Sequence, residues 1–240
     1  MPRFGSSWES LKKGFRKAAP KGVFDLAMHA REAQLRIQSR HFLDFVFVHI
    51  NKCGGTSVER ALGVPFLNHR TAEEHRTLIG QKRFDERYRF TVVRNPYERM
   101  HSLFLYRHKT LDGPLEYRQQ RFREWLEEVR ANIAGERNKF LAPARDWIVD
   151  PSTGEILVEH AYTLETLGEQ WPQLRERLPR ATALDHLNRK AGTRVARELY
   201  DESSFATVAE LFAEDFALFG YNPDPAADAM PEQPIVDFGK

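Results

Sequence analysis

The sequence predicts an α/β fold of three layers, in which helices flank a central parallel sheet. Two short apolar runs, residues 43–50 and 90–93, are rich in β-branched and aromatic side chains, which is typical of strands buried on both faces. Each run stops at a polar loop, and a helical pattern follows each loop. Because strands that alternate with helices favour a parallel sheet, we expect one such sheet at the centre of the molecule.

The composition is that of one folded domain with appended segments. The chain has 240 residues, of which 41% are hydrophobic, enough for one sizeable core. Its 36 basic and 34 acidic residues nearly balance, which does not indicate a nucleic-acid binder. A single cysteine excludes an internal disulfide, and we find neither a secretory signal nor an apolar run long enough to span a membrane. We therefore expect a cytoplasmic protein.

The chain divides into three parts: a basic helical arm over residues 1–40, a domain over residues 41–222 and a loose tail over residues 223–240. The arm has nine Lys and Arg residues against three acidic ones, a net charge of +6. Its apolar residues recur at helical spacing, with a break at Pro20. We expect the arm to pack on the domain or on a second subunit, as in a homodimer; the alternative is peripheral contact with an anionic membrane surface. The tail is rich in proline, alanine and acidic residues.

Within the domain, local signals predict the order of the elements. A helix after the first loop runs to about Leu62, where Gly63 ends it, and Thr71 with Glu74 forms a capping box for the next helix. Further helices are expected after Pro96 and over residues 116–134, 167–178, 194–200 and 203–219, with a loop at 138–153 and a short strand within 156–164. Both polar loops follow the carboxyl ends of strands, where parallel sheets bind ligands, so we expect them to form one site.

The first loop has the residues of an anion site. Lys52 stands before a glycine pair and two hydroxyl residues at the start of a helix, whose first N–H groups have no partner within it. A Walker loop has its lysine after the glycine, and the partner strand ends in an aspartate that holds Mg²⁺. Here the second strand ends in Arg94 instead. The sequence therefore predicts a P-loop-type fold with a second cation in place of a metal ligand, so that no metal is expected.

Taken together, the two loops resemble those of sulfotransferases that use 3′-phosphoadenosine 5′-phosphosulfate (PAPS). Residues 49–57 resemble the family's 5′-phosphosulfate loop, in a form closest to the carbohydrate sulfotransferases, including the heparan sulfate 2-O type. Residues 94–102 resemble its 3′-phosphate motif, and residues 185–188 and 213–221 resemble later segments. Cys53 departs from the family's usual threonine or other small residue. The resemblance implies sulfuryl transfer from PAPS to a hydroxyl acceptor, for which we expect a carbohydrate or a glycolipid.

The same resemblance implies a role for each residue of the two loops. Lys52 would contact the bridging oxygen and stabilise charge on the leaving phosphate. Arg94 and Ser102 would bind the 3′-phosphate, with Arg99 as a second basic candidate. The 5′-phosphosulfate would be held by backbone N–H groups and hydroxyls of four residues: Gly54, Gly55, Thr56 and Ser57.

A hydroxyl acceptor must lose a proton, and histidine is the natural base near neutral pH. His69 lies just before a helix and shortly after the first loop, in a segment that resembles the one where the family's base is expected. His75 is the second choice and Glu165 the carboxylate alternative, whereas His49, at the end of the first strand, is expected to pack. We therefore predict His69 as the base.

Other functions stay open at this point. A P-loop kinase-like phosphotransferase would require Mg²⁺, and a non-catalytic nucleotide- or glycan-binding module would transfer nothing. A phosphatase loop would need an arginine where Glu59 stands, so Cys53 is not expected to be a nucleophile. The acceptor is expected between residues 66–76 and 137–147, where Arg137 and Arg145 indicate an acidic or sulfated acceptor.

Overall fold

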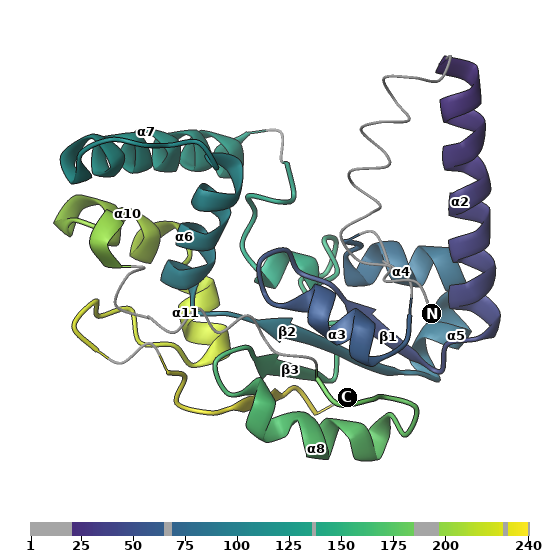
Figure 1. Ribbon diagram of the computed structural model, residues 1–240. Helices are drawn as coiled ribbons and strands as arrows, with labels where there is room; N and C mark the ends of the chain where they lie inside the picture. The colour runs from purple at the N-terminus through teal and green to yellow at the C-terminus, as the bar shows by residue number, and fades with distance from the viewer. Residues whose placement is uncertain (1–20, 65–68, 136–137, 185–196, 228–229, 240) are drawn as a thin grey trace.

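The computed structural model describes residues 21–64, 69–135, 138–184, 197–227 and 230–239, and its centre is a four-stranded sheet (Figure 1). Strands β1 (Phe45–Val48), β2 (Tyr88–Val93) and β3 (His160–Thr163) are parallel neighbours in that order. Strand β4 (Ile235–Asp237) pairs antiparallel with β3 at the edge. Helices cover both faces, which confirms the predicted three-layer P-loop-type α/β fold.

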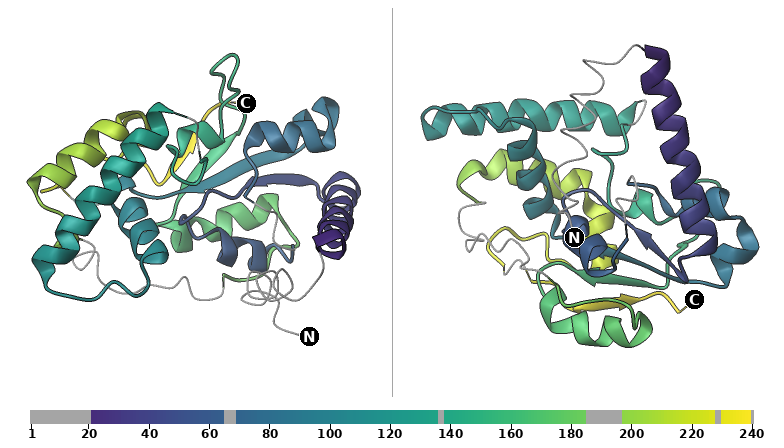
Figure 2. Two further views of the ribbon diagram at one scale, coloured as in Figure 1. Left: turned by 90° about the horizontal axis from the view of Figure 1, so that it is seen from above. Right: turned by 45° about the vertical axis from the view of Figure 1, so that its right-hand side comes forward.

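Strand β1 explains why the strand sequences are apolar throughout. Phe45 and Phe47 pack with α3 (Gly55–Ala61) and α8 (Leu167–Arg177), whereas Val46 and Val48 pack in the opposite layer. Figure 2 shows α3 and α8 on one side of the sheet and α4 and α5 on the other. The second layer consists of α4 (Ala72–Ile79), α5 (Gln81–Asp85), α6 (Pro96–Arg107), α7 (Leu115–Ala134), α10 (Glu202–Leu211) and α11 (Ala213–Phe219).

Helix α2 (Lys21–His41) forms the described part of the basic arm, and residues 1–20 lie outside the described ranges. It packs beside α4, and its last carbonyls are bound by one side chain. Arg87 donates to the carbonyls of Ser39 at 2.5 Å and of Arg40 at 2.9 Å. Because the last carbonyls of a helix have no partner within the helix, this arginine fixes the end of α2 to the corner between α5 and β2.

Several local predictions are confirmed. The Thr71 hydroxyl accepts from the Glu74 N–H at 3.1 Å, and the Glu74 carboxylate accepts from the Thr71 N–H at 2.8 Å, which is the predicted capping box. Gly220 ends α11 with a left-handed φ of 69°. The predicted helix over residues 194–200 lies partly outside the described residues; its described part is the 3₁₀ helix η2 (Arg197–Leu199).

Two other segments differ from the prediction. The tail expected to be loose contains β4, which is held by bonds between Phe238 N–H and Glu159 O at 2.9 Å and between Thr163 N–H and Pro234 O at 3.2 Å. The single helix expected over residues 203–219 is two helices, because Phe212 leaves the helical conformation with φ −117° and ψ 24°. The loop predicted at 138–153 includes the 3₁₀ helix η1 (Arg145–Trp147).

Candidate active site

The structure brings the two predicted loops to one edge of the sheet. Because β1 and β2 are adjacent and parallel, the β1–α3 and β2–α6 loops leave the same end of the strands (Figure 1). The first loop carries Lys52 and the second begins with Arg94. Burial and the nearby Arg94 guanidinium both lower the pKa of Lys52. The two predicted cations therefore belong to one electrostatic site.

The β1–α3 loop presents backbone donors as well as a cation. Lys52 and Gly54 have positive φ values of 65° and 76°, and such alternation produces a concave run of backbone N–H groups. No described group accepts a hydrogen bond from the N–H of Gly54, Gly55 or Thr56, whereas the Ser57 N–H donates to the Gly54 carbonyl at 3.0 Å. Three of the four predicted backbone donors are therefore available to an anion.

Packing inside the protein also favours glycine at residues 54 and 55, because neighbouring side chains lie close to both Cα atoms. A Cβ atom at Gly55 would lie 2.0 Å from Cδ2 of His49, and one at Gly54 would lie 2.5 Å from Cδ1 of Leu164. His49 is buried, as predicted, and its Nδ1 lies 3.0 Å from the Glu59 carboxylate. The His49 ring thus excludes a side chain at Gly55, whereas at Gly54 the positive φ and the Leu164 methyl group both disfavour one, whatever ligand the loop binds.

Above the loop, the Lys52 ammonium lies 4.5 Å from the centroid of the Tyr106 ring. Lys109, just beyond the end of α6, lies 4.8 Å from the same centroid. Neither lysine forms an ion pair with a carboxylate in the described part of the chain, and the Lys109 charge also lowers the pKa of Lys52. Sequence reasoning missed Lys109, which no motif contains; its position two helical turns after Ser102 is the available signal.

The β2–α6 loop positions Arg94 at the start of a capped helix. The Asn95 side chain caps α6 by accepting from the Tyr97 N–H at 3.0 Å. Nη2 of Arg94 lies 3.1 Å from the Glu98 carboxylate, which holds the guanidinium along α6. Ser102, half-buried on the same helix, has no hydrogen-bond partner among the described residues. The remaining N–H groups of Arg94 and the Ser102 hydroxyl can thus meet an anion.

Arg99, the second basic candidate, is a structural residue, so its prediction as a phosphate ligand is wrong. It is 1% exposed. Its guanidinium donates to Asn51 Oδ1 at 2.9 Å and to the Ala142 carbonyl at 2.9 Å. The Arg99 charge also acts on the buried Asp215 carboxylate. Burial raises the pKa of Asp215 to about 6, and the positive charge of Arg99 opposes that rise. Arg99 therefore braces the β1–α3 loop against residues 138–142.

His69, the predicted base, lies against the end of β1. Its Nδ1 is 3.0 Å from the carbonyl oxygen of His49, and since a carbonyl only accepts, Nδ1 carries the proton and Nε2 the lone pair. The two imidazole rings are 4.1 Å apart, and the rings of Phe140 and Trp147 approach His69 edge-on. Burial and His49 lower the pKa of His69 to about 4, and the Lys52 charge adds to this shift. The imidazole is therefore neutral at neutral pH, the state that a base requires.

The two alternative bases are placed for other roles. His75 is 4% exposed on the inner side of α4, and burial lowers its pKa to about 3, so it does not face an acceptor. Glu165, after β3, accepts from the Asn95 N–H at 2.9 Å and from the Tyr221 hydroxyl at 2.7 Å. Both of its oxygens are thus engaged in joining the β2–α6 loop to the C-terminal segment.

The expected acceptor region lies beside His69, but its charges differ from the prediction. Arg145 pairs with Glu214 at 3.0 Å and Lys139 with Glu74 at 2.7 Å, whereas residue 137 lies outside the described residues. Arg145 is therefore already neutralised, and it lends no support to an acidic acceptor.

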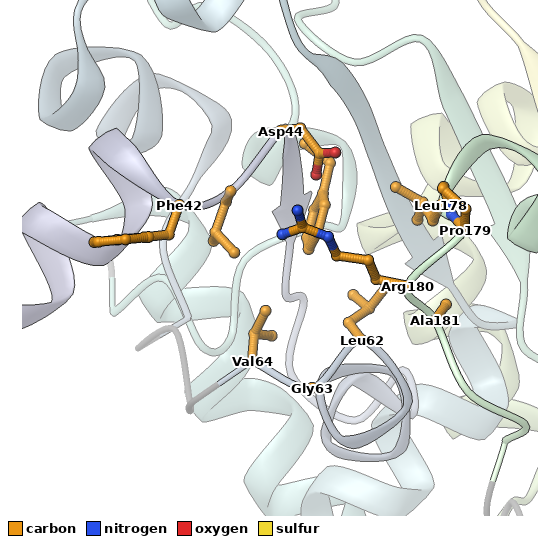
Figure 3. A pocket seen from close by; sticks show the side chains of 11 residues that line it. Phe42, Asp44, Leu62, Gly63, Val64, Leu178, Pro179, Arg180 and Ala181 are labelled. Atoms are coloured by element: carbon orange, nitrogen blue, oxygen red, sulfur yellow. The ribbon is translucent and has the colours of Figure 1, made fainter.

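A cavity of about 400 Å³ lies elsewhere, at the amino end of β1 (Figure 3). Its lining is mainly apolar, with Phe42, Phe45, Leu62 and Leu178 beside the exposed Arg180, and it includes none of the predicted site residues.

Burial raises the pKa of Cys53 to about 12, so this thiol stays protonated. Within the described ranges, no group of three His, Cys, Asp or Glu side chains is placed to hold a metal ion.

The three-layer α/β fold places cations on two loops at the carboxyl ends of adjacent parallel strands, which is where such sheets bind ligands. The model of the sulfotransferase family matches residues 34–222, most of the chain, and the match includes both loops and α11. The chain therefore belongs to the sulfotransferase family, whose members are transferases. Searches of the curated proteins and of the solved structures gave no match.

Throughout the described residues, every helix is too short or too polar to cross a membrane.

Proposed function

We propose that this protein transfers a sulfuryl group from PAPS to a hydroxyl of a carbohydrate or glycolipid acceptor. Membership of the sulfotransferase family supports sulfuryl transfer, and PAPS is the family's general donor. One observation above all supports this donor: Lys52 and Arg94 converge from neighbouring strand ends. The carbohydrate acceptor and the closeness to the heparan sulfate 2-O type rest on the resemblance of residues 49–57. We propose the cytoplasm as the compartment only because a single cysteine excludes an internal disulfide, which suits a reducing environment.

PAPS carries two anionic groups on one ribose, which suits a site with two cation-bearing loops. The backbone N–H groups of Gly54, Gly55 and Thr56 would hold the 5′-phosphosulfate, with the hydroxyls of Thr56 and Ser57 beside them. Arg94 and Ser102 would hold the 3′-phosphate. Binding both ends fixes the register of the donor, so that the sulfuryl group faces the acceptor.

In the proposed reaction, the acceptor oxygen forms a bond to sulfur while the bond between sulfur and the bridging phosphate oxygen breaks. Charge develops on the phosphate that leaves, and Lys52 stabilises it. Nε2 of His69 takes the hydroxyl proton. The products are the sulfated acceptor, 3′-phosphoadenosine 5′-phosphate and a proton, so that atoms and charge balance.

The test is transfer of ³⁵S from labelled PAPS to a panel of neutral glycans, acidic glycans and glycolipids in the presence of EDTA. We expect label in at least one acceptor with the wild type and none above background with Lys52→Ala. Lys82→Ala is the matched control, because Lys82 is an exposed lysine on α5. A parallel arm offers γ-³²P-ATP with Mg²⁺ and the same acceptors.

Phosphate transfer that requires Mg²⁺, without sulfate transfer, would replace the proposal with a phosphotransferase. Binding of 3′-phosphoadenosine 5′-phosphate without transfer from either donor to any acceptor would favour a nucleotide-binding module instead.

A further inference from the structure

Helix α2 exposes an apolar stripe along its length. Val23, Leu26 and Ile37 are 50%, 70% and 55% exposed, and Ala30 and Ala33 lie exposed between them. The spacing alternates between three and four residues, which aligns all five on one side of the helix. We call these five residues the α2 stripe. Over 21 residues the helix is about 31 Å long, so the stripe is an extended surface.

The stripe faces away from the domain because the other side of α2 is fixed. Ser39 is buried, Met28 is half-buried, and Arg87 clamps the last carbonyls of the helix. Figures 1 and 2 show α2 at the edge of the molecule, beside α4 and α5. A rigidly anchored helix therefore presents this surface to a partner.

The charges beside the stripe indicate the partner. At 100° per residue, the positions of His29, Arg36 and Arg40 lie close to one side of the stripe and that of His41 to the other, whereas the two acidic positions, 25 and 32, lie farther round the helix. Over residues 21–41 the helix has four Lys and Arg residues against two acidic ones, so two copies of α2 would repel each other overall. An anionic surface complements these basic positions.

We propose that the α2 stripe docks the protein on an anionic lipid bilayer, with α2 lying in the plane of the interface. The aliphatic side chains of the stripe enter the boundary between headgroups and acyl chains, and Arg36 and Arg40 contact anionic headgroups. The net charge of +6 over residues 1–40 adds long-range attraction to the same surface. Docking of this kind is independent of the reaction and of the donor.

The experiment is sedimentation of the full chain with vesicles of phosphatidylcholine, with and without phosphatidylglycerol. We expect binding to the anionic vesicles only, weakened by salt. The double variant Leu26→Glu/Ile37→Glu should bind at least about tenfold more weakly, since it removes apolar contact and adds repulsion. Arg36→Gln/Arg40→Gln should weaken binding about tenfold and flatten its salt dependence.

Leu115→Glu is the matched control, because Leu115 is an exposed leucine, 42% accessible, at the start of α7. This variant should bind like the wild type, and circular dichroism should give all variants the same melting temperature. Equal binding to neutral and anionic vesicles, or unchanged binding of Leu26→Glu/Ile37→Glu, would overturn the proposal. A dimer in analytical ultracentrifugation that this double variant dissociates, without vesicle binding by the wild type, would assign the stripe to a second copy.

Discussion

The β1–α3 and β2–α6 loops each present one cation at the same edge of the sheet, but they hold it in different ways. Lys52 stands on a backbone with φ 65°, and its ammonium lies over the Tyr106 ring without a carboxylate partner in the described chain. Arg94 is braced by Glu98 at 3.1 Å at the start of a capped helix. A braced guanidinium suits charge already present on a ligand, whereas a lysine without a counter-charge suits charge that develops during a reaction.

From this difference we infer that the two loops have different functions in the proposed reaction. We expect changes in the first loop to act mainly on the rate and changes in the second mainly on nucleotide binding. The predictions below test that division and the residues around the two loops, from the largest effect to the smallest.

Lys52→Ala has the largest expected effect. Loss of a group that stabilises the leaving phosphate should reduce kcat by about 10²–10³ while the Kd for 3′-phosphoadenosine 5′-phosphate changes by less than about fivefold. Steady-state kinetics and calorimetry on one preparation separate the two quantities. A large loss of affinity with little change in kcat would assign Lys52 to binding and remove the contrast between the loops.

His69→Ala should reduce kcat by about 10²-fold if this residue is the base. Since the pKa of His69 is lowered to about 4, the neutral imidazole persists as the pH falls through 6.5. The rate should therefore stay level from neutral pH to about pH 5 and fall near pH 4. His29→Ala, on exposed α2, is the control and should leave the profile unchanged. Loss of activity with a midpoint near the ordinary histidine pKa would point to another base.

Gly55→Ala tests whether the first loop depends on its close contact with His49. A Cβ 2.0 Å from the His49 ring must displace that ring, so unfolding free energy should fall by about 1–3 kcal/mol. Gly168→Ala in α8, where no atom lies within 4 Å of the added carbon, is the control and should be neutral or stabilising by up to about 1 kcal/mol. Equal denaturation midpoints for the two variants would show that His49 does not constrain the loop.

Lys109→Gln has the smallest expected effect. Lys109 shares the Tyr106 ring with Lys52 and lowers its pKa, but it is exposed and stands outside both loops. We expect the KM of PAPS or of an anionic acceptor to rise about two- to fivefold, with kcat nearly unchanged. Lys82→Gln is the control. A loss in kcat as large as that of Lys52→Ala would mean that Lys109 belongs to the reacting centre.

Much of the fold could be predicted because its signals are local. The capping box at Thr71 and the apolar run of β1 each depend on residues within a few positions. The break at Phe212 has no such signal, since its apolar side chain fits the helical stripe on either side. Strand β4 is three residues long and is held by bonds to Glu159 and Thr163, which are distant in the sequence, so neither its length nor its composition indicates pairing.

In the site, the same distinction holds. The placement of Lys52 and Arg94 at the same edge of the sheet was predictable because each follows an apolar strand almost directly. The structural role of Arg99 was not, because its partners Asn51 and Ala142 come from distant parts of the chain. The burial of His75 had a signal that was missed: it shares helical spacing with buried Ala72 and Ile79. For Glu165, only the fold reveals that the Tyr221 hydroxyl reaches its carboxylate.

The most direct test of the two-loop site compares two nucleotides that differ only in the 3′-phosphate. Calorimetric titrations, in EDTA and again with Mg²⁺, would measure the affinities of the wild type and of Arg94→Gln for 3′-phosphoadenosine 5′-phosphate and for adenosine 5′-phosphate. We predict that the wild type prefers the first by at least about tenfold, and that Arg94→Gln reduces this preference to about twofold or less. Equal affinities of the wild type for both nucleotides, or binding only with Mg²⁺, would contradict a metal-free site in which Arg94 holds the 3′-phosphate.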